Sequence, residues 1–141
     1  MMTAANGWTL HPQLDADSAP VGDLPLCRLL ALRDANYPWL VLVPRRPNAC
    51  DVIDLTDADQ ARLAVESAQA GRALKDMTRC TKLNVAALGN AVPQLHVHII
   101  ARFSDDAAWP KPVWGVVPAK PYTDAALADF VGRMKRLMAL D

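Results

Sequence analysis

Two of the three histidines of this chain, His96 and His98, lie in a segment of alternating polar and apolar residues, Gln94-Leu95-His96-Val97-His98-Ile99. A β-strand over this segment would place Gln94, His96 and His98 on one face and the apolar side chains on the other. Two imidazoles at this spacing lie about 6.5 to 7 Å apart along a strand. A neutral imidazole is a nucleophile near pH 7, and its neighbour can donate a hydrogen bond or a proton to the departing atom. The spacing therefore fits attack on phosphorus.

The same pair suits two other roles. Zinc or iron binds such a pair when a third ligand arrives from elsewhere, but the segment has no acidic residue and His11 is the only other histidine. A buried pair can also be purely structural, provided that each ring finds a hydrogen-bond partner. For His11 itself, which has no partner at a useful spacing, we expect a surface or structural role. The pair alone leaves these alternatives open.

The composition limits the class of protein. A chain of 141 residues, 52% of them hydrophobic, fits one globular domain over residues 1–141. Fifteen basic and fifteen acidic residues cancel, which argues against nucleic acid or an anionic membrane as partner. The three cysteines are odd in number and widely spaced, which favours reduced thiols over disulfides or structural zinc. With no signal-like start and no apolar run of about 18 residues, we expect a cytoplasmic protein.

A hairpin and a long helix precede the histidines. Leu26–Arg33 and Trp39–Val43 are strand-like runs joined by the turn-forming segment Asp34–Pro38. The clearest helix begins after Thr56, which with Asp59 resembles a capping box, and continues to about Met77. We expect this helix to pack on the sheet through an apolar stripe. The stripe consists of Ala61, Ala64, Ala68 and Leu74.

The remaining segments are a strand, two loops and a final helix. Thr81–Leu88 is a further strand candidate, and Gly89-Asn90 followed by Pro93 predicts a turn into the histidine segment. The segment Trp109–Pro118 contains three prolines and two tryptophans, which predicts an ordered loop. Its aromatic side chains could line a ligand pocket, cover a subunit interface or cover the domain's own core. Thr123 is expected to cap a final helix whose apolar side carries Leu127, Phe130, Val131, Met134 and Met138.

The N-terminal residues 1–24 form an arm in this interpretation. Trp8–Pro12 could make a short strand or an extended arm, and Asp15–Pro20 has the composition of a loop. The predicted fold is thus α+β, with an antiparallel sheet of about five strands, one long helix and a C-terminal helix. The loop and final helix occupy residues 104–141.

The histidine segment resembles the signature of the histidine triad (HIT) superfamily of nucleotide hydrolases and transferases, in which three histidines alternate with apolar residues. Gln94 to Ile100 matches six of the seven signature positions by residue type. Gly89-Asn90-Ala91-Val92 is similar to the segment that often precedes the signature in the family, and Arg102 stands where many members have an arginine. The hairpin and the long helix follow the family's order, so the resemblance covers about residues 25–103 and implies a HIT-like fold.

The resemblance implies a mechanism. The central histidine of the family, here His96, attacks the α-phosphate of a nucleotide, and water resolves the nucleotidyl-histidine. The last histidine, here His98, contacts the bridging or leaving atom. The resemblance further implies a homodimer and a small-molecule nucleotide, either a dinucleoside polyphosphate or a nucleoside phosphoramidate, and needs neither metal nor cofactor. The substrate-binding candidates that it indicates are Asn90 and Gly89 in the turn, Asn84 in the preceding strand and Asp34 near the family's ribose contact.

Two residues depart from the family pattern. Gln94 replaces the first histidine of the signature, and Trp39 stands where many members have a further histidine. A glutamine can hold a backbone group or a neighbouring imidazole, but it cannot carry a proton as an imidazolium does. Because Gln94 stands at the first position of the signature, we count it with His96 and His98 as a catalytic candidate. Two functions remain in view: a nucleotide hydrolase or transferase, and a nucleotide-binding or regulatory protein with little turnover.

Overall fold

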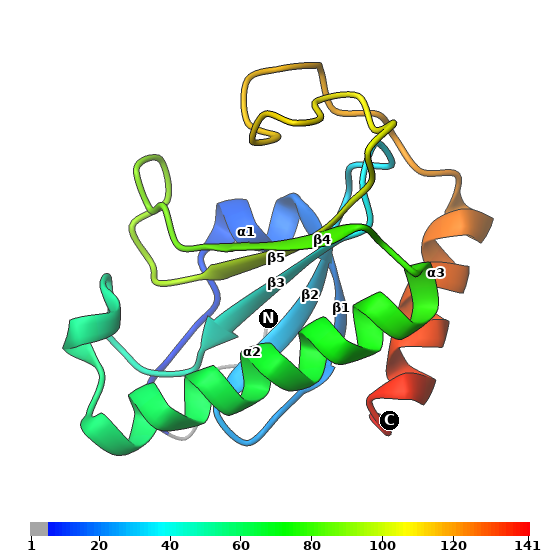
Figure 1. The fold of residues 1–141 in the computed structure, drawn as a ribbon. Helices are drawn as coiled ribbons and strands as arrows, with labels where there is room; N and C mark the ends of the chain where they lie inside the picture. The colour runs from blue at the N-terminus through cyan, green and yellow to red at the C-terminus, as the bar shows by residue number, and fades with distance from the viewer. Residues whose placement is uncertain (1–5) are drawn as a thin grey trace.

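The computed structural model describes residues 6–141, so most of the segment Met1–Gly7 and the first part of the expected N-terminal arm lie outside the described residues. Five strands form one antiparallel sheet, as the sequence predicts for an α+β fold (Figure 1). The elements in chain order are α1 (Pro12–Ala16), β1 (Ser18–Asp23), β2 (Cys27–Leu32), β3 (Trp39–Pro44), the 3₁₀ turn η1 (Val52–Asp54), α2 (Asp57–Thr78), β4 (Lys82–Ala86), β5 (Val97–Arg102) and α3 (Asp124–Leu137).

The histidine strand is an interior strand of the sheet. The strand order is β1-β2-β3-β5-β4, so β5 pairs with β3 on one side and with β4 on the other. His98 lies opposite Val41 of β3 and opposite Ala86 of β4. The predicted hairpin is confirmed as β2 and β3, with Leu30 opposite Val41. Ladders on both sides therefore fix the position of His98.

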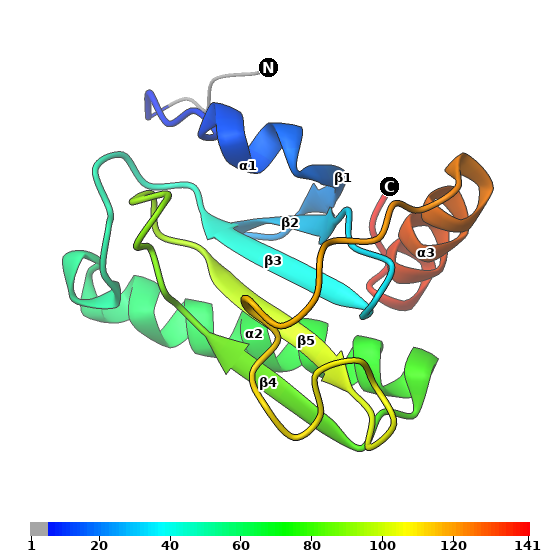
Figure 2. The ribbon, with the colours of Figure 1, turned by 90° about the horizontal axis from the view of Figure 1, so that it is seen from above.

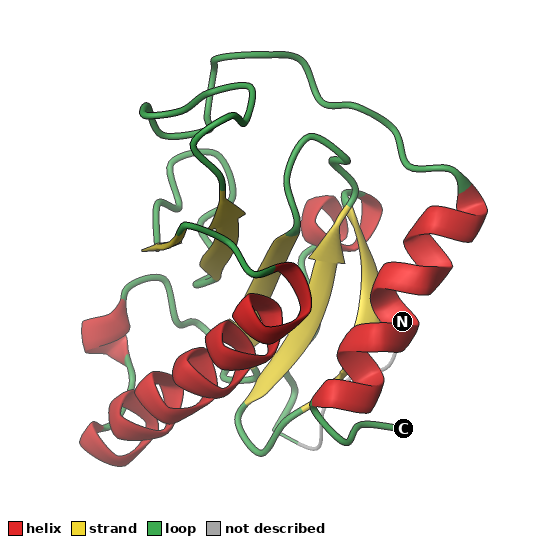
Figure 3. Ribbon diagram, turned by 45° about the vertical axis from the view of Figure 1, so that its right-hand side comes forward, coloured by secondary structure: helices red, strands yellow, loops and turns green. Residues whose placement is uncertain are grey.

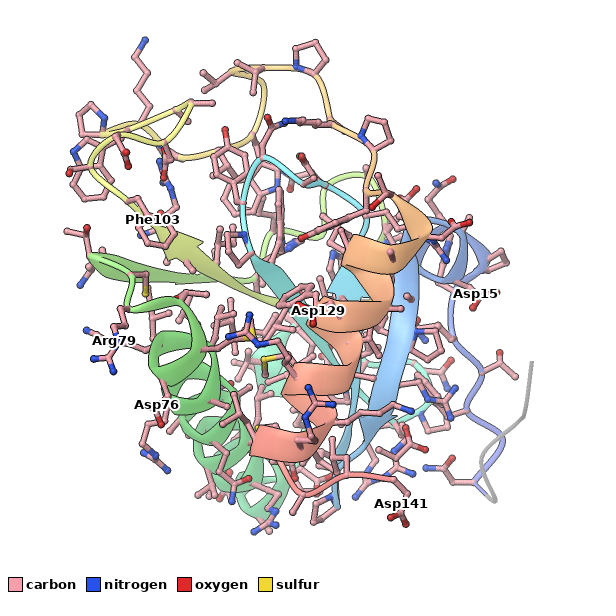
Figure 4. The ribbon with its side chains drawn as sticks, turned by 90° about the vertical axis from the view of Figure 1, so that its right-hand side faces the viewer. Asp15, Asp76, Arg79, Phe103, Asp129 and Asp141 are labelled. Carbon is pink, nitrogen blue, oxygen red and sulfur yellow. The ribbon has the colours of Figure 1, made fainter. Side chains whose placement is uncertain are left out.

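Helices α2 and α3 cover one face of the sheet. Figure 1 shows α2 running across this face, and Figure 4, with Asp76 labelled on α2 and Asp129 on α3, shows the two helices side by side. The larger apolar core lies between these helices and the strands, because alternate side chains of every strand point toward it. Its members from β5 and the preceding residues are Leu95, Val97, Ile99 and Ala101.

The opposite face carries the histidines and a second, smaller core. Here the cover consists of α1, residues 8–11 before it, and the long segment 103–123 between β5 and α3 (Figures 1 and 2). Segment 103–123 is loop throughout, which confirms the loop predicted at Trp109–Pro118 (Figure 3), and Figure 4 marks the start of the segment at Phe103. Buried members of this core include Trp8, Leu14, Trp39, Val41, Ile100, Ala108 and Val113.

The loop predicted over Asp15–Pro20 is wrong, and of the two alternatives for Trp8–Pro12 the strand is not observed. Trp8–Pro12 forms no strand; Pro12 begins α1, and the ring of His11 caps this helix by accepting a hydrogen bond from the backbone N–H of Gln13. The fifth strand is instead β1, at residues expected to be a loop. β1 is an edge strand with an irregular register at Pro20, and an edge tolerates a proline that cannot donate to the ladder.

The boundaries of α2 are confirmed, but its predicted stripe was mostly wrong. The hydroxyl of Thr56 accepts a hydrogen bond from the N–H of Asp59, as the capping prediction requires. Of the four stripe residues only Leu74 is buried, because alanine periodicity carries little information when each methyl group buries so little area. The buried face consists of Leu63, Glu66, Ala70, Gly71, Ala73 and Leu74.

A glutamate lies in the middle of that buried face. Glu66 is the only glutamate of the chain and is fully buried. Its carboxylate accepts hydrogen bonds from the N–H groups of Leu26 and Cys27 and from Arg62. These bonds join α2 to the start of β2, since a buried carboxylate is tolerated only when it is hydrogen-bonded.

The final helix follows its prediction. Thr123 caps α3 by accepting from the N–H of Ala126, and Phe130 and Met134 are buried against the larger core. Within residues 6–141, none of the helices is both long and apolar enough to cross a membrane.

Candidate functional site

His96 lies immediately before β5 and is 7% exposed. Its Nδ1 atom is 2.7 Å from the backbone carbonyl oxygen of Gln94. A carbonyl oxygen can only accept, so Nδ1 carries the ring's proton in the neutral form and Nε2 keeps its lone pair. The predicted strand begins three residues later than expected, at Val97, but the alternation of faces already holds at His96. His96 is thus an imidazole with a free nucleophilic nitrogen.

His98 is held in the opposite tautomer. The indole Nε1–H of Trp39 donates a hydrogen bond to Nδ1 of His98 over 3.0 Å. An indole nitrogen can only donate, so Nδ1 bears the lone pair and Nε2 carries the proton. Burial, together with the neighbouring His96, lowers the pKa of His98 to about 4. At neutral pH His98 therefore presents an N–H group and no positive charge.

The two imidazoles and the indoles of Trp39 and Trp114 form a cluster of four rings packed edge to face. The ring centroids of His96 and His98 are 4.9 Å apart, and the centroid of Trp114 is 5.1 Å from that of His98. Trp114 comes from segment 103–123 and is 37% exposed, whereas Trp39 is 5% exposed. Of the three alternatives for the aromatic side chains of this segment, Trp114 shows the first, since it borders a cavity of the site. The neighbouring Val113 packs in the domain's smaller core.

One cavity adjoins His96, and a second adjoins the indoles that pack on His98. The smaller, of about 180 Å³, is lined by His96, Gly89 and residues 50–52, among others. The larger, of about 530 Å³, is lined by Trp39, Trp114 and Asp34, among others. His96 borders the first cavity, and the two indoles that touch His98 border the second. A cavity therefore lies directly beside His96, and another lies beside the two indoles that pack on His98.

The predicted substrate-binding residues separate into two groups. Gly89, with φ of +74°, lines the smaller cavity beside His96, and Asp34 lines the larger one. One carboxylate oxygen of Asp34 accepts from the N–H of Lys120, which ties the turn to segment 103–123. Asn84 instead accepts a hydrogen bond from the buried Arg102. Asn90 is exposed and lines neither cavity.

Gln94 uses its side chain away from the imidazoles. Its Oε1 accepts from the N–H of His11 over 2.8 Å, and its Nε2 donates to the carbonyl oxygen of Thr9 over 2.9 Å. Of the two partners expected for this glutamine, the backbone group is the one observed. Gln94 contacts His96 through its main-chain carbonyl alone. Its side chain fastens the N-terminal segment over the sheet.

The described residues offer the histidines no further metal ligands. Residues 6–141 contain no cluster of three histidine, cysteine or acidic side chains arranged to hold a metal ion. The ring of His11, the remaining histidine, is hydrogen-bonded as a helix cap.

The bond from Trp39 is the feature that the sequence did not reveal. The sequence shows a tryptophan in place of a histidine at position 39, but it does not show that the indole donates to His98. That bond depends on the register, which sets Trp39 opposite Ile100, two residues from His98 on the same face. That register follows from long-range pairing, and no local pattern specifies it.

Comparison with known proteins gives a consistent result. The family model for the HIT domain matches residues 13–105. A histidine triad protein from Bradyrhizobium japonicum is 53% identical, with a TM-score of 0.91 over 93% of this chain and 98% of that chain. A histidine triad protein from Sinorhizobium meliloti is 42% identical, with a TM-score of 0.89 over 92% and 96%. One from Marinobacter aquaeolei is 39% identical, with a TM-score of 0.91 over 94% and 96%. No curated protein sequence matches the chain.

Proposed function

This chain belongs to the histidine triad family, and from that premise we propose that it is a nucleotide phosphohydrolase or nucleotidyl transferase acting at an α-phosphate through His96. The observation that carries the proposal is the hydrogen bond from Nδ1 of His96 to the carbonyl of Gln94. It supports the nucleophilic role because it leaves the lone pair on Nε2 in a buried ring beside a cavity.

The proposed reaction has two steps. The Nε2 lone pair of His96 attacks the α-phosphorus, and the bond to the departing group breaks with its electron pair going to that group. The resulting nucleotidyl-histidine carries a positive charge, which the carbonyl of Gln94 stabilises through the retained Nδ1–H bond. Water or another acceptor then attacks phosphorus and releases its proton to the solvent, while the P–N bond breaks and its electron pair returns to Nε2. In the first step the Nε2–H of His98 donates a hydrogen bond to the departing atom and keeps its proton.

The larger cavity supports a nucleoside as the bound part of the substrate. Its volume of about 530 Å³ falls within the range of small-molecule sites, about 300 to 1,000 Å³. The indoles of Trp39 and Trp114 supply flat apolar walls suited to a base, and Asp34 supplies an acceptor suited to a ribose hydroxyl. The substrate class includes dinucleoside polyphosphates and nucleoside phosphoramidates.

The test is turnover of both substrate classes by the wild type, by His96→Ala and by the control His11→Ala. We expect His96→Ala to lose at least about a thousandfold in kcat, since nucleophile and intermediate both disappear. His11→Ala should keep its activity, because that ring caps α1. Mass spectrometry of quenched wild type should detect the nucleotidyl adduct on His96. Equal rates for wild type and His96→Ala would refute the proposal.

Nucleotide binding with little turnover is the second candidate. It is favoured because the side chain of Gln94 is hydrogen-bonded to the backbone of Thr9 and His11. His96 and His98 therefore have no third polar side chain beside them from position 94. Calorimetry distinguishes the candidates: nucleotide binding without turnover supports this one, and no binding at millimolar nucleotide excludes both.

The proposal includes a homodimer, as the family resemblance implies. β4 forms one edge of the sheet, and Val85 on it and Leu88 beyond it are 57% and 48% exposed. Exposed apolar side chains at an unpaired edge favour association. Light scattering on the purified protein would decide, and a monomer mass would refute this part.

A further inference from the structure

Trp39 restricts what His98 can do. Its indole N–H cannot accept a proton, so Nδ1 of His98 can be protonated only if the 3.0 Å hydrogen bond between them breaks. The indole is 5% exposed and packs edge to face against Tyr37 as well as His98, which leaves it little room to turn away. His98 is therefore fixed as a neutral ring with its proton on Nε2.

The surroundings of His98 give no support to a positive charge. Val41 faces it from β3, Ala86 from β4 and Trp114 from segment 103–123. Within residues 6–141 the one titratable group that acts on His98 is His96, which lowers the pKa of His98. Among residues 6–141 no carboxylate makes an ion pair or a hydrogen bond with His98. The ring can donate a hydrogen bond, but it has no second proton to give.

The two substrate classes differ in what they require from this ring. When a P–O–P bond breaks, the bridging oxygen takes the electron pair and leaves as a phosphate oxyanion, which is stable because the second pKa of a phosphate monoester is about 6. A hydrogen bond from Nε2–H is sufficient help. When a P–N bond breaks, the nitrogen that takes the electron pair needs a proton to leave as an amine. A neutral His98 would have to become an imidazolate to supply it.

We infer that Trp39 is a positioning residue that makes His98 a hydrogen-bond donor in place of a general acid, so that the site prefers P–O–P substrates over P–N substrates. The inference rests on the proposed function and deepens it, because it selects one of two substrate classes. It also assigns a role to the position where many family members have a further histidine.

The experiment compares kcat/KM for a dinucleoside polyphosphate and for a phosphoramidate of the same nucleoside. Wild type should prefer the polyphosphate. Trp39→Phe keeps an aromatic ring but removes the N–H donor, so Nδ1 becomes free to take a proton. We expect it to shift the ratio of the two kcat/KM values toward the phosphoramidate by at least about tenfold, since general acid catalysis contributes about 10² to 10⁴. Trp114→Phe, which also alters an indole against His98, changes both values but leaves their ratio unchanged.

Nitrogen-15 NMR of the histidine rings tests the inference without turnover. In the wild type, Nδ1 of His98 should be unprotonated and Nε2 protonated from about pH 5 to pH 8, and in Trp39→Phe the ring should become doubly protonated at a higher pH. A doubly protonated His98 in the wild type over that range overturns the inference, as does an unchanged substrate ratio in Trp39→Phe or an equal shift in Trp114→Phe. Failure of both substrates with wild type refutes the proposed function and the substrate preference, while the NMR result still decides the role of Trp39.

Discussion

Replacement of Gln94 by alanine is expected to destabilise the fold by about 2 kcal/mol and to change kcat by less than about threefold. The expectation follows from how this residue divides its contacts. Its side chain binds Thr9 and His11, whereas its main-chain carbonyl, which the substitution retains, accepts from His96. Stability and catalysis should therefore respond separately.

The magnitude follows from two hydrogen bonds. Each side-chain to backbone bond contributes about 0.5 to 1.5 kcal/mol net, so the loss of both gives about 1 to 3 kcal/mol. A loss in the lower half of that range would apply if the freed N–H of His11 and the freed carbonyl of Thr9 could both bind water. The N–H of His11 is part-buried and would lose its acceptor, so we expect a loss near the middle of the range. For a chain of this length, about 2 kcal/mol lowers Tm by about 4 to 8 °C.

Guanidinium unfolding followed by tryptophan fluorescence measures the change in the free energy of unfolding. The matched control is Gln13→Ala, which removes an exposed side-chain bond to Asp17 within the same N-terminal region and should change stability by less than about 0.5 kcal/mol. Gln94→Glu adds a second comparison, because it keeps an acceptor for His11 but places a carboxylate oxygen against the carbonyl of Thr9. It should also be destabilised.

The opposite pattern would refute this reasoning. If Gln94→Ala lost a hundredfold in kcat with unchanged unfolding free energy, the glutamine side chain would act on the imidazoles during turnover. Its bonds to the N-terminal segment would then be incidental.

Two further predictions concern buried carboxylates. The carboxylate of Glu66 accepts from the backbone N–H groups of Leu26 and Cys27, and in Glu66→Gln an amide NH₂ group would face one of these two donors. The substitution should lower the free energy of unfolding, measured in urea, by about 2 to 4 kcal/mol. A change below about 0.5 kcal/mol would contradict this prediction. Burial raises the pKa of Asp106, but hydrogen bonds from Arg102 and from three backbone N–H groups outweigh it and hold the pKa at about 2. A depressed carboxyl pKa stabilises the fold above the unfolded pKa of about 3.8 and loses this effect as pH falls toward 2. The stability advantage of wild type over Asp106→Asn should shrink by about 2 kcal/mol between about pH 5 and pH 2, and a constant difference would disprove the assignment.

The part of the fold that the sequence predicts is the part with strong local signals. The hairpin turn at Asp34–Pro38, the cap at Thr56 and the cap at Thr123 each place a structural boundary within a residue or two. β1 was missed because its local composition is that of a loop. It becomes a strand through antiparallel pairing with β2, a non-local interaction.

The histidine pair of the candidate site was predictable from the sequence, and its surroundings were less so. His96 and His98 follow from spacing and alternation, which the backbone geometry of a strand converts directly into a shared face. The placements of Asn84 and Asn90 could not be read in the same way. The amide of Asn84 accepts from Arg102, which lies 18 residues further along the chain, and Asn90 is exposed to solvent.

The two departures from the family pattern have unequal chemical consequences. The tautomer of His96 is set by a backbone carbonyl at position 94, a group that every residue type supplies, so the exchange of histidine for glutamine leaves the nucleophilic nitrogen unaffected. The tautomer of His98 is set by the side chain at position 39, and only a residue with an N–H donor and no acceptor fixes it in this form. A histidine there could exchange its own proton with His98 and let that ring become charged. The identity of residue 94 should therefore be visible in stability, and that of residue 39 in the choice of leaving group.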